Sequence, residues 1–162
     1  MENLEQVFFS ERPEFDIWNN LKNYSYNKYI HNYFKNRGIE PDQKLLDTVS
    51  GSISQAFEYF EASRIVSIQT APLLLYYGTI NLLFGASCLL EGKVIDISGH
   101  GLALELDTLK NQTILNVEAS IKNNTGAGFT NYLRILSKND ISRPHTLKLE
   151  DIFSSIPELY KE

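Results

Sequence analysis

His100 is the residue whose type and setting best suit chemistry, because it lies between Gly99 and Gly101. Flanking glycines allow unusual backbone angles and leave an imidazole uncrowded, as acid–base catalysis requires. The same pattern also fits a turn in which His100 hydrogen-bonds locally. No serine or cysteine with nucleophile-elbow spacing accompanies it. We therefore favour the structural role and keep His100 as a candidate catalytic residue.

Arg64 is the other candidate catalytic residue. It stands directly before a long uncharged run, where it could face His100 and bind an anion. The alternative is a solvated helix charge paired with Glu61 or Glu58 on the same helix. We favour the solvated helix charge, because a charge at the end of a helical pattern is usually solvated.

Basic and aromatic side chains alternate along residues 19–37, as a single-stranded nucleic acid would require. The tyrosines, however, fall on the apolar stripe of a helix. We therefore predict that most of them belong to the core and that the basic residues form a solvated face. The candidate binding residues of the nucleic-acid alternative are Lys28, Lys35 and Arg37.

Composition excludes several classes of protein. The chain has 162 residues, is 43% hydrophobic and carries a formal charge of −5, so it is no bulk polycation. One cysteine excludes an internal disulfide, and three scattered histidines argue against a metal site. We expect no metal and no cofactor. The first residues lack the pattern of a signal peptide, which predicts a cytoplasmic protein.

The spacing of apolar residues predicts mainly helices. We expect them over 15–24 and 26–35, from Ser50 or Ser52 to about 64, and over 71–90, 129–136 and 149–155. Alternating apolar residues predict one strand over 115–121. The sequence thus indicates a single helical domain over residues 1–162. It is a bundle around a long buried helix, residues 71–91, with a small β element near 113–122.

Residues 65–90 contain no charged residue and no histidine. A run of this length fits a membrane span, but no second span or basic flank supports insertion, so we favour a buried bundle helix. Gly78 and Gly85 share one face and predict the close approach of another helix. Asn81 would then hydrogen-bond across that contact, and Tyr77 and Asn81 are further candidate binding residues.

The motifs Pro-Leu-Leu-Leu-Tyr-Tyr-Gly at 72–78 and His-Gly-Leu at 100–102 resemble the YaaC-like bacterial protein family. Trp18, residues 56–63, Asn81-Leu82 and the ending 149–159 are similar to that family as well. Its members are usually considerably longer, so the resemblance implies an N-terminal portion. Ala71 departs from the pattern, since a basic residue is expected before the proline. The family is essentially uncharacterised and implies little about function.

A more distant similarity is to HEPN domains, helical bundles in which an Ala-rich helix, a long apolar helix and a His-containing turn follow in this order. Many are dimeric ribonucleases of toxin or antiphage systems that use an arginine followed four to six residues later by a histidine. This sequence has no such pair. The similarity therefore implies a HEPN-like bundle in which the ribonuclease chemistry is absent.

These observations favour a non-catalytic interaction or assembly subunit, in a bacterial antiphage or toxin-type system. We expect it to form a homo-oligomer or to dock onto a larger protein partner, and not to bind a membrane. The alternative is a HEPN-like ribonuclease or nucleotide- or RNA-binding protein that uses His100 and a basic residue. Whether the chain is an enzyme stays open, and the sequence leans against it.

Overall fold

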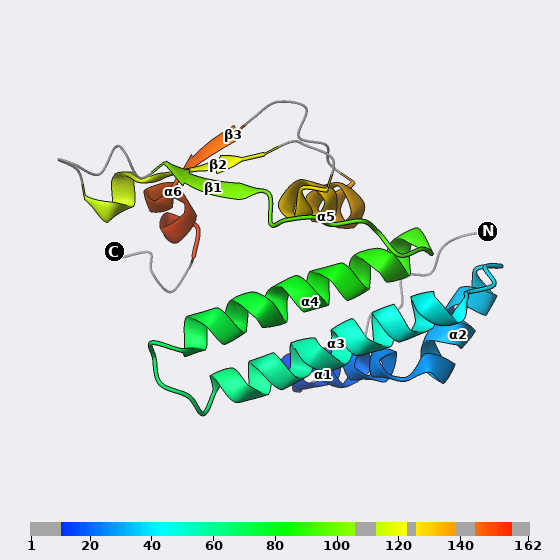
Figure 1. Cartoon of the computed structure of the whole chain (residues 1–162). Coiled ribbons are helices and arrows are strands. Elements are labelled where there is room, and N and C mark those ends of the chain that lie inside the picture. The colour runs from blue at the N-terminus through cyan, green and yellow to red at the C-terminus, as the bar shows by residue number, and fades with distance from the viewer. Residues whose placement is uncertain (1–10, 106–112, 123–125, 139–144, 157–162) are drawn as a thin grey trace. The chain divides into compact units, whose positions relative to one another are not determined.

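The structure is a computed structural model that describes residues 11–105, 113–122, 126–138 and 145–156. Its contacts group the chain into two compact units, Met1–Val94 and Ile95–Glu162, whereas the sequence predicts one domain. The described part of the first unit is helical, and the second unit combines helices with a small sheet (Figure 1). The prediction of a mainly α fold with a small β element is confirmed.

The first unit begins with short helical segments close to their predicted positions. They are α1 (Pro13–Lys22), the 3-10 turn η1 (Asn23–Ser25) and α2 (Asn27–Asn36). Pro13 occupies the first turn of α1, where its missing N–H is not needed. On α2, Ile30 and Phe34 lie one turn apart and are fully buried. Burial of this stripe holds α2 in the core.

The tyrosines of this region form an aromatic cluster that is partly exposed. Tyr24 lies edge-on to Tyr29 and Tyr33, with ring centroids 4.9 and 5.8 Å apart. Burial, followed by the neighbouring phenols, raises the pKa of Tyr24 above its ordinary value. Tyr26 and Tyr29 are 63% and 43% exposed. The prediction of core tyrosines is wrong for these two, because only part of α2's aromatic face packs inward.

The next helix, α3 (Gln43–Ser63), starts about two turns earlier than the sequence predicts. Asp42 is its N-cap, since its side chain accepts the N–H of Leu45 at 2.7 Å. The predicted start at Ser50 or Ser52 is therefore wrong. Ser50, Gly51 and Ser52 resemble a helix start, but they lie inside α3. The buried apolar stripe begins in the first turn and includes Leu45, Leu46 and Val49.

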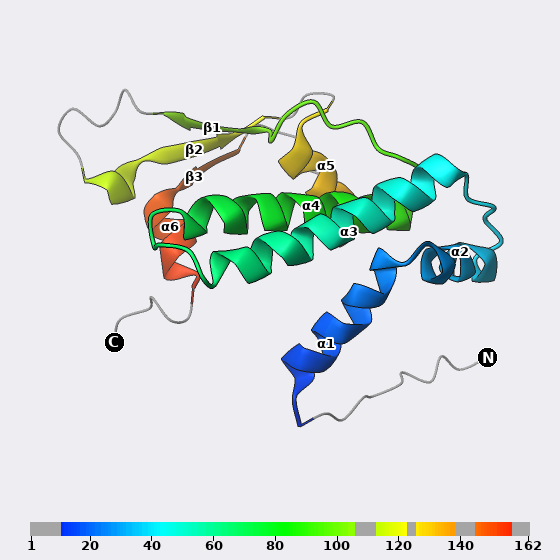
Figure 2. The same cartoon turned by 60° about the horizontal axis from the view of Figure 1, so that its bottom comes forward.

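Helix α4 (Ala71–Glu91) begins where the sequence predicts and packs along α3 (Figure 2). A Cβ atom added at Gly78 would stand 2.8 Å from Cε1 of Phe60. A Cβ atom added at Gly85 would stand 3.0 Å from Cδ1 of Ile53. The predicted close approach of another helix to this glycine face is therefore confirmed, and the neighbour is α3.

The predicted burial of helix 71–91 holds for only part of α4. Its buried residues are Gly78, Gly85, Ser87 and Cys88, whereas Leu73 is 54% exposed. Among the described residues, α4 alone is long and apolar enough to span a membrane, which is weak evidence because core helices pass the same test. The helix ends at Gly92, which adopts the left-handed conformation that glycine allows after a helix.

The second unit contains a three-stranded antiparallel sheet in the order β1 (Leu102–Glu105), β2 (Glu118–Ile121) and β3 (His145–Lys148). The predicted strand near 113–122 is β2, which is shorter than expected because 114–116 form the 3-10 turn η3. The helices are α5 (Gly128–Ser137) and α6 (Leu149–Ser154), close to their predicted positions. Buried residues in this unit include Val117, Ala119, Ile121, Ala127 and Tyr132.

Candidate functional site

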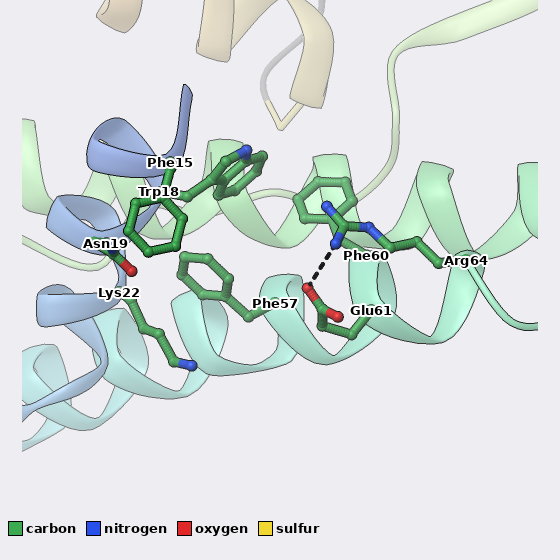
Figure 3. A pocket seen from close by; sticks show the side chains of 8 residues that line it. All are labelled: Phe15, Trp18, Asn19, Lys22, Phe57, Phe60, Glu61 and Arg64. Atoms are coloured by element: carbon green, nitrogen blue, oxygen red, sulfur yellow. Dashed lines mark ion pairs between the residues drawn. The ribbon is translucent and has the colours of Figure 1, made fainter. Parts of the chain in front are cut away.

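A cavity of about 370 Å³ lies between α1 and the C-terminal half of α3 in the first unit. We call it the Trp18 cavity. Figure 3 shows its lining side chains converging from the two helices. The lining residues are Phe15, Trp18, Asn19, Lys22, Phe57, Phe60, Glu61 and Arg64.

Aromatic rings form the walls of the Trp18 cavity. The indole of Trp18 lies 5.4 Å from the rings of both Phe57 and Phe60, at interplanar angles of 71° and 63°. These edge-to-face pairs stabilise the contact of α1 with α3. Phe15 stands beside them and is 58% exposed. The cavity therefore offers apolar surface that the fold does not fully cover.

Charged side chains stand at two sides of these rings (Figure 3). Lys22 comes from the last turn of α1, and Arg64 follows the last residue of α3. Arg64 pairs with Glu61 at 3.4 Å, as the sequence predicts, and both side chains are more than two-thirds exposed. Two cations and one carboxylate leave the rim with one net positive charge. The cavity can therefore attract an anion.

A second cavity, of about 250 Å³, belongs to the second unit. We call it the His100 cavity. It is built where the loop before β1 meets the start of α5, because the amides of Gly128 and Phe129 donate to the carbonyls of Gly99 and His100. Its lining residues are Ser98, Gly99, His100, Gly101, Leu102, Lys122, Gly126 and Ala127.

The imidazole of His100 is exposed and makes a local hydrogen bond. Nδ1 accepts the backbone N–H of Leu102 at 3.1 Å. Because a backbone N–H can only donate, this hydrogen bond uses Nδ1 as its acceptor and, in a neutral ring, leaves the proton on Nε2. In this geometry His100 can donate to an anion at Nε2, but taking up a proton at Nδ1 would break the bond to Leu102. The geometry supports a structural role better than a general base.

The basic residues of segment 19–37 differ in how far the fold engages them. Arg37 donates to the carbonyls of Leu89 and Leu90 at 3.2–3.3 Å and lies over the ring of Tyr33 at 5.4 Å. A cation at this place satisfies carbonyls at the end of α4 and complements the helix dipole. Arg37 is thus engaged within the fold. Lys28 and Lys35 are exposed on α2.

Comparison with protein families gives one decisive match. The family model of the YaaC-like proteins matches residues 18–162. The chain belongs to the YaaC-like family. No curated protein and no solved structure matches it, so the distant similarity to HEPN domains stays a prediction.

The family motif at 72–78 lies on α4 of this YaaC-like chain. Tyr77 stacks on Tyr59 of α3, with ring centroids 5.7 Å apart, and is 43% exposed. The amide of Asn81 donates to the carbonyl of Tyr77 at 2.9 Å, within its own helix. The predicted hydrogen bond of Asn81 across the helix contact is therefore wrong, because the side chain turns back along α4.

The turn between α3 and α4 carries an exposed apolar surface. Ile65 and Ile68 are 87% and 85% exposed, and Leu73 continues this surface onto the first turn of α4. We call Ile65, Val66, Ile68 and Leu73 the tip surface. Apolar side chains grouped in this way are typical of interaction sites, whereas single exposed ones need no explanation.

Sequence reasoning missed two features of these sites. It did not bring Trp18 together with Arg64, since helix packing alone unites residues so far apart. It also did not place Lys122 beside His100, although Lys122 lines the same cavity. The signal for Lys122 was its position directly after a predicted strand, where a side chain can reach a neighbouring turn. Among the described residues, no group of three or more His, Cys, Asp or Glu could hold a metal ion.

Proposed function

We propose that this YaaC-like chain is a non-catalytic assembly subunit that pairs with a second copy through the tip surface and the adjoining exposed face of α4. The observation that carries this proposal is the exposure of Ile65 and Ile68, 87% and 85%. Leaving such side chains in water forgoes the free energy that apolar burial provides, about 1.5–3 kcal/mol for each fully buried side chain.

Charge supports a second copy as the occupant. Residues 65–90 carry no charge, whereas the whole chain carries a net charge of −5. Most of the surface of one copy therefore repels that of another, and the uncharged segment 65–90 offers the surface on which this repulsion is smallest. Tyr76 and Tyr77, each 43% exposed, extend the tip surface along α4 with aromatic groups that are common in interfaces.

Light scattering after size exclusion, over about a hundredfold range of protein concentration, tests the proposal. We expect the wild-type chain to approach the mass of a dimer and the double variant Ile65→Glu/Ile68→Glu to stay monomeric. Because both side chains are exposed, the variant should keep its circular dichroism spectrum and melting temperature. The matched control Tyr26→Glu places a charge at another exposed residue, 63% exposed on the α2 side of the unit, and should associate as the wild type does.

Two results would overturn this function. A wild-type chain that is monomeric at every concentration has no self-association to explain. A wild-type chain that floats with lipid vesicles, while the double variant does not, makes the tip surface a membrane contact instead.

A second candidate function is the binding or cleavage of RNA at the His100 cavity. The observation that favours it is the placement of Lys122 beside His100 in one cavity, since a cation and an imidazole N–H can both hold a phosphate. Incubating total RNA with wild-type and His100→Ala protein tests it. Equal, intact RNA in both reactions, with no retention of RNA by the wild type, would exclude it.

The cellular setting is proposed from resemblance. The similarity to HEPN domains favours a bacterial defence or toxin-type system and a cytoplasmic location. Deleting the gene and challenging the host with phage tests this setting, and an unchanged plating efficiency across a broad phage panel would contradict it.

A further inference from the structure

We propose that the Trp18 cavity binds a small aromatic anion, a planar ring system that carries one carboxylate or phosphate group. The ring lies against Trp18 and Phe60, and the anionic group lies at the rim with Lys22 and Arg64. This site belongs to the first unit alone and does not depend on self-association.

The aromatic walls of the cavity favour a ligand with a planar ring. A volume of about 370 Å³ falls in the range of small-molecule sites, roughly 300–1,000 Å³. Trp18 is turned steeply to both phenylalanines, at 71° and 63°. A flat ring that stacks on one wall therefore meets another edge-on, and both arrangements are favourable for aromatic pairs. Phe15, 58% exposed, can close over the ring from the solvent side.

The charged residues at the rim favour a ligand with a negative charge. Lys22 forms no ion pair with any described residue, and the ion-pair partner of Arg64 among these residues is the exposed Glu61. An exposed ion pair contributes little free energy, so a ligand anion can replace the Glu61 carboxylate on Arg64 at small cost. The guanidinium offers two parallel N–H groups to a carboxylate or phosphate. Asn19 lines the same cavity and adds an amide donor.

The proposal predicts that a substitution of Glu61 increases the affinity for the ligand. Its carboxylate competes with the ligand for Arg64 and repels an anion in the cavity. Replacing it with glutamine should therefore strengthen binding, whereas a residue that only supports the structure would weaken binding or leave it unchanged when replaced.

The experiment is a nuclear magnetic resonance titration of the full chain with naphthylacetate. Trp18 is the only tryptophan, so its indole N–H gives a single signal that reports on the cavity. We expect this signal to shift and saturate with naphthylacetate. The neutral isostere naphthylacetamide should bind about tenfold more weakly, which corresponds to loss of one charge interaction. Cyclohexylacetate, which keeps the charge and loses the flat ring, should also bind more weakly.

Variants at the rim locate the site. Lys22→Gln and Arg64→Gln should each weaken naphthylacetate binding about three- to fivefold and reduce its advantage over the amide. Glu61→Gln should strengthen binding by a similar factor. Phe15→Ala, at an exposed side chain, should weaken binding of both compounds equally. The control Lys28→Gln removes an exposed cation that does not line the cavity and should change nothing.

Three results would overturn the proposal. The indole signal does not move while other signals do, which places binding elsewhere. The acid and the amide bind equally, which removes the role of Lys22 and Arg64. Phe15→Ala and Arg64→Gln change the mass of the assembly and not the titration, which makes the cavity part of a protein interface.

Discussion

The Trp18 cavity and the His100 cavity are of comparable size, about 370 and 250 Å³, but they are built from different parts of the chain. Side chains from two helices enclose the first, and its charged groups have weak or no partners within the described residues. Backbone segments enclose the second, and its imidazole is held by the N–H of Leu102. A concave surface is therefore a better candidate site when its polar groups are not already engaged by the fold.

The largest effect that separates the two cavities should come from Gly78→Leu. The new side chain would push against the ring of Phe60, which is 2.8 Å from a Cβ at this position and forms a wall of the Trp18 cavity. Overpacking costs up to about 3 kcal/mol, and the gain in helix propensity offsets about 1 kcal/mol of it. We expect the free energy of unfolding of the first unit to fall by about 2 kcal/mol in urea denaturation.

Gly51→Leu is the matched control for that change. Gly51 lies inside α3, and a Cβ there meets nothing within 4 Å. The same substitution should therefore stabilise the chain by up to about 1 kcal/mol. Equal destabilisation by both variants would show that the glycine face of α4 is not closely packed.

Gly101→Ala should have the next largest effect and should act on the His100 cavity. Gly101 has φ +76°, and a Cβ there would stand 2.9 Å from the Cβ of Ala127. Strain and contact together should cost about 1.5 kcal/mol. Hydrogen exchange of the Lys122 amide, which donates to the Gly101 carbonyl at 2.8 Å, should become faster by a matching factor.

Gly99→Ala is the control in that loop, because a Cβ at Gly99 meets nothing within 4 Å. We expect its exchange rates to stay close to those of the wild type. If Gly99→Ala opened the loop as much as Gly101→Ala, the His100 cavity would not depend on the left-handed backbone at Gly101.

The smallest effects should come from substitutions of Arg37 and Arg64, one arginine that the fold engages and one that it leaves exposed. Arg37 donates to carbonyls at the end of α4, so Arg37→Gln should lower the free energy of unfolding by about 1 kcal/mol. Arg64 has an exposed ion pair, so Arg64→Gln should change it by less than about 0.5 kcal/mol. Urea denaturation of both variants compares them directly, and a larger loss for Arg64→Gln would reverse their roles.

The sequence predicts those parts of the fold that depend on local signals. α4 is predicted well because Thr70, Pro72 and Gly92 mark its ends, and the glycine face is predicted because glycine in a helix needs a packing reason. The start of α3 is not predicted correctly. Asp42, Ser50 and Ser52 are equally good N-cap residues, and only the burial of Leu45 in the folded protein decides between them.

The candidate site is predicted less well than the fold. The residues of the Trp18 cavity come from α1 and α3, and no spacing in the sequence shows that two helices cross at Trp18. The exposure of one side of α4 also could not be predicted from the sequence, because an uncharged helix has the same composition whether it is buried or forms an interface.

Sedimentation velocity of three proteins across one concentration series tests most directly whether the chain associates through the uncharged segment 65–90 and independently of His100. They are the wild type, His100→Ala and Ile65→Glu/Ile68→Glu. We expect the wild type and His100→Ala to form the same dimer with the same dissociation constant, and the double variant to sediment as a monomer. The same monomeric sedimentation of all three, or loss of the dimer in His100→Ala alone, would contradict it.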